Sequence, residues 1–229
     1  DGTLVCLTPG ESISMKENNK EFPSKGWILA FHPDLICGTP LGLNIHNYTF
    51  FSYCPEEALH LSLREKQIIL EFLERIRQEL ERCIDRHSKK IISKYIELLL
   101  DYCTRFYERQ FITRSEVNKK VFREFNHLLD NHFNVKVSLS TDVLSDEYCA
   151  NLLHLSPAYF NDLLKYEIGK EFKEYIQFKR FEIAKGWLVN TDKTLGQIAQ
   201  ELGFSNSQYF SRLFKKITGC SPNEFRMPN

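Results

Sequence analysis

The stretch TLGQIAQELGFSNSQYFSRLFKKITG, residues 194–219, contains two short helical patterns separated by a glycine. Thr194 and Gln197 form a capping box that starts the first helix. Gly203 follows that helix and supplies a tight turn where positive φ is needed. The pattern predicts two short helices joined by a turn of about three or four residues, which is a helix-turn-helix.

The second helix of this pattern is predicted to start at another capping box, formed by Ser205 and Gln208. In a helix-turn-helix, the second helix lies in the major groove of DNA and its first residues reach base edges. Amide side chains can pair with adenine, arginine with guanine, and lysines suit phosphates. A solvated polar face is the alternative interpretation. The outward residues, which are the predicted DNA contacts, are Asn206, Ser207, Gln208, Ser211, Arg212, Lys215 and Lys216.

The same pattern occurs fifty residues earlier, where YFNDLLKYEIG matches the later YFSRLFKKITG. Residues 146–169 and 196–219 share six identities in 24 positions at this offset. A helical solenoid is disfavoured because such folds usually need three or more copies. We call residues 145–169 the first repeat and residues 194–219 the second repeat.

The first repeat has its own start signal, with Ser156 as N-cap and Pro157 at the first helical position. Leu153 stands where the second repeat has Gly203, so the first turn is expected to have a different backbone or some strain. The counterparts of the predicted DNA contacts are Ser156, Ala158, Tyr159, Asn161, Asp162 and Lys165.

Charge distinguishes the two repeats. Residues 196–219 carry three basic residues and one acidic residue, a net +2, whereas residues 146–169 carry one basic and four acidic residues, a net −3. Asp162 occupies the position of Arg212. Because phosphate contacts supply most non-specific affinity, the second repeat is expected to bind DNA more strongly.

The segment KEFKEYIQFKRFEIAKGWLV between the repeats is predicted to form a single linker helix. About 17 helical residues span roughly 25 Å. Successive major grooves on one face of DNA lie ~34 Å apart. With the width of each repeat added, such a helix could present two recognition helices to neighbouring grooves.

Bulk composition limits the class of protein. The 229 residues carry 30 basic and 30 acidic side chains, so attraction to DNA must come from local patches. The seven cysteines are scattered without a CxxC pair, which argues against a disulfide scaffold or zinc site and suits a reducing cytosol. No apolar run approaches the ~20 residues needed to span a bilayer. The chain is predicted to be cytoplasmic, with no membrane partner.

Residues 1–61 are predicted to form strands and turns, with strands at GTLVCL, WILAF and ALHLS. Because three strands can form only a small sheet, we expect this region to be a partial β domain that lacks its start. Residues 62–134 are predicted to be a helical connector. Residues 135–229 are predicted to be the DNA-binding domain, and NVKVSLSTD, residues 134–142, is the predicted boundary.

The connector begins at a capping box formed by Ser62 and Glu65. A second helix is predicted from about Ser88 to Gln110, and a third from Thr113 to about Phe133. The first two suggest an antiparallel hairpin whose apolar face packs within the chain or forms a homodimer contact. The predicted dimerisation residues are Ile68, Ile69, Phe72, Leu73 and Ile76.

Three stretches of the sequence resemble those of a known family. TLGQIAQELGFSNSQYFSRLFKKITGCSPNEFR resembles the C-terminal signature of AraC-type bacterial transcription regulators. HLSPAYFNDLLKYEIGKEFKEYI and FKRFEIAKGWL resemble the first helix-turn-helix and the linker helix of that family. More loosely, DGTLVCLTPGE, GWILAFHPDL and the helices at 62–110 resemble the end of its cupin-like ligand domain and its helical dimerisation region.

The resemblance implies a mainly α protein with two tandem helix-turn-helix units joined by a linker helix, preceded by a helical hairpin and a partial cupin-like β domain. It implies a ligand-responsive activator that binds double-stranded promoter or operator DNA. A homodimer, contact with RNA polymerase and a small-molecule effector are also implied.

An enzyme and a protein-interaction or ligand-sensing module are the alternative classes of protein. The chain has no GxSxG, P-loop, HExxH or GxGxxG motif, and its histidines form no metal-ligand pair, so we expect no catalytic residue, metal or cofactor. The remaining alternative is a protein-interaction or ligand-sensing module that has lost strong DNA binding, which the acidic first repeat favours.

Overall fold

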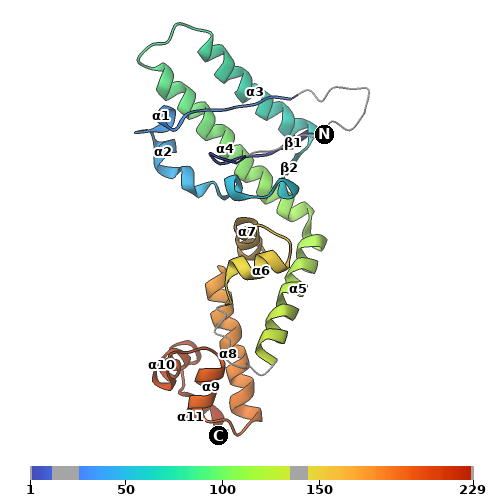
Figure 1. The fold of residues 1–229 in the computed structure, drawn as a ribbon, viewed down its shortest axis with the longest axis vertical. Coiled ribbons are helices and arrows are strands. Elements are labelled where there is room, and N and C mark those ends of the chain that lie inside the picture. Colours follow the sequence, from blue (N-terminus) through green and yellow to red (C-terminus); the bar gives the residue numbers. More distant parts are fainter. Residues whose placement is uncertain (1, 12–25, 135–143, 228–229) are drawn as a thin grey trace. The chain divides into compact units, whose positions relative to one another are not determined.

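The computed structural model describes residues 2–11, 26–134 and 144–227 (Figure 1). It divides into two compact units. Unit 1 comprises residues 1–118 and 154–160, and unit 2 comprises residues 119–153 and 161–229. Helices dominate both units, as predicted, and no helix of the described ranges is long and apolar enough to cross a membrane.

Strands are confined to a two-stranded antiparallel sheet within the described part of unit 1. Strand β1, Gly2–Leu4, pairs with β2, Leu59–Leu61, in the register Gly2 to Leu61. The strand predicted at 27–31 is wrong: the segment has no ladder partner among the described residues, and Ile28 is 89% exposed. Two strands of three residues cannot close a barrel, so the cupin-like domain stays a prediction.

Residues 33–57 form short helical turns where strand and turn were predicted. Proline explains this difference, because its ring fixes φ and it has no N–H for a β ladder. Pro33, Pro40 and Pro55 each stand at the start of a helical segment, following the caps His32, Thr39 and Cys54. The elements are α1, Pro33–Ile36; α2, Pro40–Asn44; and the 3₁₀ turns η1, Ile45–Asn47, η2, Thr49–Ser52, and η3, Pro55–Glu57.

The predicted helical hairpin is formed by α3, Leu63–Leu80, and α4, Ser88–Thr113, which lie side by side (Figure 1). Helix α3 starts at the predicted capping box, in which Ser62 and Glu65 each accept a hydrogen bond from the other's backbone N–H. The start predicted for the third helix is wrong. Thr113 ends α4, where its hydroxyl donates to Gln110 O, and α5 spans Ser115–Asn134.

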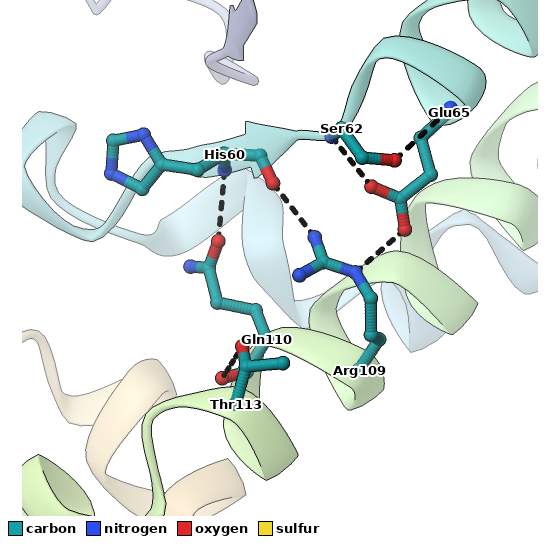
Figure 2. A network of polar contacts seen from close by, with 6 residues as sticks. All are labelled: His60, Ser62, Glu65, Arg109, Gln110 and Thr113. Atoms are coloured by element: carbon teal, nitrogen blue, oxygen red, sulfur yellow. Dashed lines mark hydrogen bonds and ion pairs between the residues drawn. The ribbon is translucent and has the colours of Figure 1, made fainter. Parts of the chain in front are cut away.

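A polar network fixes β2 and the start of α3 against α4 (Figure 2). Arg109 Nε donates to Glu65 Oε1 at 2.6 Å, and its Nη2 donates to His60 O at 2.7 Å. Gln110 Oε1 accepts His60 N–H at 2.8 Å. Burial raises the pKa of Glu65, but the hydrogen bonds from Ser62 and Arg109 outweigh it and hold the pKa below its usual value.

The predicted dimerisation residues divide into two groups. Ile69 and Ile76 are 5% and 3% exposed, so these two side chains are covered within the chain. Ile68, Phe72 and Leu73 are half-buried, and the Phe72 ring lies 5.3 Å from that of Tyr102 on α4. Homodimerisation through the half-buried group stays a prediction.

Unit 2 contains most of α5 and the C-terminal helices. These are α6, Asp146–Leu152; α7, Pro157–Ile168, of which the first turn belongs to unit 1; α8, Phe172–Asn190; α9, Leu195–Glu201; α10, Ser207–Thr218; and α11, Pro222–Arg226. Helix α8 is the predicted linker helix. The boundary predicted at 134–142 lies outside the described residues except for Asn134, so it stays a prediction.

Helix α8 packs its first half against α5. Phe125 on α5 is fully buried and lies 6.1 Å from Phe172 and 5.8 Å from Tyr175, measured between ring centroids. The Tyr175 hydroxyl donates to Asn126 Oδ1 at 2.6 Å. The linker helix is thus supported along its first turns by apolar contacts and a hydrogen bond.

Candidate nucleic-acid interface

The second repeat begins with α9, which starts at the predicted capping box. Thr194 Oγ1 accepts Gln197 N–H at 3.2 Å, and Gln197 Oε1 accepts Thr194 N–H at 2.8 Å. Gly203 adopts φ +73° in the turn, as its place in the sequence predicts. The predicted cap of the next helix is wrong by one residue: Asn206, not Ser205, is the N-cap of α10, and its Oδ1 accepts Tyr209 N–H at 2.7 Å.

An aromatic cluster fixes the orientation of α10. Phe210 and Phe214 are fully buried, with ring centroids 5.6 Å apart. Phe181 of α8 lies 6.3 Å from Phe210, and Phe225 of α11 lies 5.4 Å from Phe214. Because these rings hold one face of α10 inside unit 2, the opposite face is presented to solvent.

The outward face of α10 carries the predicted contacts. Asn206, Gln208, Arg212, Lys215 and Lys216 are exposed, and Ser207 and Ser211 are half-buried. Two of these groups already have partners in the helix. The Asn206 side-chain oxygen caps α10, and the Ser211 hydroxyl donates to Ser207 O at 2.8 Å. A bidentate amide contact to adenine therefore suits Gln208 better than Asn206, since such a contact uses both the oxygen and the nitrogen.

The first repeat has a shorter turn than the second. Four residues separate α6 from α7, whereas five separate α9 from α10. His154 takes the left-handed conformation, φ 56°, that Gly203 takes in the second repeat. Leu153 is the C-cap of α6 with φ −91°, so the expected strain falls on the next residue. A histidine there is uncommon and costs about 1–2 kcal/mol relative to the right-handed region.

Helix α7 starts where the sequence predicts, but its first turn is covered. Ser156 is the N-cap, and its Oγ accepts Tyr159 N–H at 3.2 Å. Ser156 and Tyr159 are only 4% and 6% exposed, whereas Tyr209, at the matching place on α10, is 41% exposed. The backbone N–H and hydroxyl of Ser156 both donate to the Glu57 carboxylate.

The other predicted contacts of the first repeat are more accessible. Ala158, Asn161 and Asp162 are half-buried, and Lys165 is exposed. Asn161 Nδ2 donates to Asp146 Oδ2 at 2.9 Å, which holds this amide against the start of α6. Lys165 lies 3.8 Å from the Glu171 carboxylate. The outward face of α7 is therefore smaller and less basic than that of α10.

The described residues include no evident metal-binding cluster. Within the ranges that the structure describes, no three His, Cys, Asp or Glu side chains gather closely enough to hold a metal ion. The sequence did not reveal the role of Glu57, which lies 99 positions from Ser156, the serine that it contacts. No local pattern connects two residues at such a separation.

Comparisons with known proteins match this C-terminal region most strongly. A family model described as a helix-turn-helix domain matches residues 149–227, which include both α7 and α10. The arabinose operon regulatory protein of Salmonella typhimurium is 32% identical over 101 residues, or 44% of this chain and 32% of that protein. The C-terminal region is therefore similar to the helix-turn-helix domain of transcription regulators, which supports the predicted resemblance to the AraC type.

Matches to two other regulators differ in extent. The uncharacterized HTH-type regulator YtdP of Bacillus subtilis is 33% identical over 111 residues, covering 48% of this chain and 14% of that protein. The uncharacterized HTH-type regulator YijO of Escherichia coli is 24% identical over 225 residues, covering 98% of this chain and 76% of that protein. The chain spans less than half the length of the other two relatives named here.

Proposed function

We propose that this AraC-type chain is a sequence-specific DNA-binding transcription regulator that reads two neighbouring major-groove segments with α7 and α10. The observation that carries the proposal is the outward face of α10, where Gln208, Arg212, Lys215 and Lys216 are exposed on a helix fixed by its aromatic core. Amide and guanidinium groups suit base edges, and the two lysines suit phosphates.

The two repeats have unequal roles in this proposal. Helix α10 supplies the strong contact, because its exposed side chains are basic. Helix α7 supplies a weaker or more selective contact, because Asp162 stands at the position of Arg212 and Ser156 and Tyr159 are buried. An aspartate can accept a hydrogen bond from the cytosine amino group, and it repels phosphates.

The proposal also includes regulation of the protein by a ligand, with activation of transcription as the outcome. Support comes from the relative whose name assigns it to the arabinose operon and from unit 1, most of which precedes the helix-turn-helix domain. The effector, a homodimer and RNA polymerase as a partner belong to the same proposal.

The test is a binding titration of the chain on genomic DNA fragments, with the salt concentration varied. Binding should weaken steeply with salt, with a slope of about −0.9 in log affinity per log salt for each phosphate neutralised. Footprinting the tightest fragment should then protect two segments on one face of the duplex. A slope near zero would leave the DNA-binding proposal without support.

Arg212→Ala gives the residue-level test. Loss of a bidentate base contact should weaken binding to the best site by about 1–3 kcal/mol and relax its sequence preference. Lys216→Ala is the matched control, since it removes the same charge from a neighbouring turn and should weaken all sequences equally. The second candidate, a protein-interaction module, is favoured by the buried start of α7 and would leave Arg212→Ala without effect on DNA affinity.

A further inference from the structure

Glu57 makes an unusually complete set of hydrogen bonds for a buried carboxylate. The residue ends η3 and is 5% exposed. Its Oε1 accepts Ser156 N–H at 2.7 Å, and its Oε2 accepts the Ser156 hydroxyl at 2.5 Å and Cys54 N–H at 2.7 Å. Charge-assisted hydrogen bonds of this kind are stronger than neutral ones. Glu57 is therefore positioned to hold Ser156 firmly.

The groups that Glu57 engages are those through which a recognition helix contacts the DNA backbone. Ser156 is the N-cap of α7, a helix of 12 residues. The first N–H groups of a helix lack partners within it, and the helix dipole favours an anion there. Phosphates of DNA commonly bind at helix N-termini and at serine hydroxyls. A carboxylate at this place competes with a phosphate for the same donors.

Aromatic contacts reinforce the hydrogen bonds. The Tyr159 ring lies 5.1 Å from the Tyr53 ring, with the two planes at 78°, and 5.2 Å from the Phe111 ring. Burial raises the pKa of Tyr159 above its usual value, although the charge of Arg114 and its hydrogen bond to the tyrosine act in the opposite direction. Tyr53 and Phe111 are themselves 8% and 6% exposed. The first turn of α7 is thus shielded from solvent on both its polar and its aromatic side.

We propose that Glu57, Tyr53 and Phe111 form an autoinhibitory contact that holds the first turn of α7 away from DNA. The inference rests on the proposed function. In the closed state α10 alone is free to bind, and the first repeat joins it only after Ser156 leaves Glu57. Because the affinity of a two-part reader is reduced by the fraction of molecules that are closed, opening the contact tightens binding.

Glu57→Ala tests the contact, with Glu56→Ala as its matched control. Each variant removes one negative charge, but Glu56 is exposed. Loss of hydrogen bonds to a charged group corresponds to about a tenfold change in population. We therefore expect Glu57→Ala to bind a duplex that spans both grooves about tenfold more tightly than Glu56→Ala does. We also expect its salt slope to steepen by about 0.9 for each phosphate that α7 gains.

Hydrogen exchange supplies a readout that does not depend on DNA. In Glu57→Ala, the amides of Ser156 and Tyr159 should exchange faster than in Glu56→Ala, whereas the α10 amides should be unchanged. If Glu57→Ala fails to fold, Glu57→Gln retains the side-chain volume without the charge and should show the same changes at smaller size. Ser156→Ala combined with Glu57→Ala should lose part of the gain in affinity, because the hydroxyl donor is then absent.

The outcomes separate this inference from the proposed function. If Arg212→Ala weakens binding but Glu57→Ala and Glu57→Gln bind like Glu56→Ala, the autoinhibitory contact is refuted and the proposed function stands. Weaker binding by Glu57→Ala than by Glu56→Ala also refutes it, since the contact would then present α7 to DNA. If neither the wild-type chain nor any variant binds DNA in a salt-dependent way, both proposals fail.

Discussion

The first turns of α7 and α10 differ more in solvent exposure than in sequence. Both helices begin at a polar cap, Ser156 or Asn206, and both place a tyrosine three residues later. On α10 that tyrosine is 41% exposed, and on α7 it is 6% exposed. The inward residues therefore specify how a helix packs in its repeat. Accessibility of the outward side also depends on what the rest of the chain places beside it.

The largest difference is expected from removing a core ring. Phe160 and Phe210 are both fully buried at matching positions, so Phe160→Ala and Phe210→Ala should each lower the free energy of unfolding by about 3–5 kcal/mol. Their effects on DNA should diverge, because α10 carries the stronger contact. Denaturant titrations measure the first quantity and fluorescence anisotropy the second. Equal losses of DNA affinity would contradict the unequal roles of the repeats.

The turns should respond with opposite signs to exchange of glycine. Gly203→Ala places a side chain at φ +73°, where its Cβ meets Arg180 at an ordinary 3.5 Å, so the backbone dominates the cost. We expect a loss of about 1–2 kcal/mol. His154→Gly relieves the same conformation and should stabilise the first repeat by up to about 1 kcal/mol, after the extra entropy of the unfolded glycine is subtracted. Thermal unfolding of the two variants tests the pair, and a loss in both would disprove the strain at His154.

The two tyrosine hydroxyls offer a finer contrast. Tyr159 is buried and forms a hydrogen bond with Arg114, so Tyr159→Phe should destabilise the chain by about 1 kcal/mol. Tyr209→Phe, at an exposed position, should change stability by less than about 0.5 kcal/mol. Urea titrations with both variants compare them directly. Similar values would show that the Tyr159 environment contributes no more than the solvent-exposed one.

Reversing the charge at Asp162 should give the smallest effect in the closed chain. Asp162→Lys makes the first repeat resemble the second and should steepen the salt slope by about 0.9 if one phosphate is newly neutralised. The gain should be larger when Glu57→Ala is present, because α7 then reaches DNA. Salt-dependent anisotropy on non-specific duplexes measures both slopes. No change in either background would place Asp162 outside the interface.

Local signals predicted much of the helical architecture. The capping boxes at Ser62 and Thr194 and the cap at Ser156 each occur where the sequence places them, because both partners lie within one helical turn. Predictions failed where neighbouring residues competed. Asn206 caps α10 although Ser205 also fits the pattern, and Thr113 ends α4 rather than opening the next helix.

Long-range contacts set the limit for strands and for the site. Segment 27–31 has strand-forming residues, but a strand also needs a partner, and local composition does not supply one. Periodicity identified the outward face of α10 because the inward residues Phe210 and Phe214 lie on the same helix. It could not reveal that Ser156 and Tyr159 are buried, since their partners Glu57, Tyr53 and Phe111 come from distant parts of the chain.

The shorter turn of the first repeat has a consequence for engineering chimeric regulators. The helices α6 and α9 align at an offset of 49 residues, whereas α7 and α10 align at 50. A graft of the α10 surface onto α7 that starts after the cap keeps the recognition helix in phase. A graft that also brings the turn inserts one residue and moves the left-handed position from His154 to a glycine. Specificity can therefore be exchanged between the repeats as a helix face, but not as a whole motif of equal length.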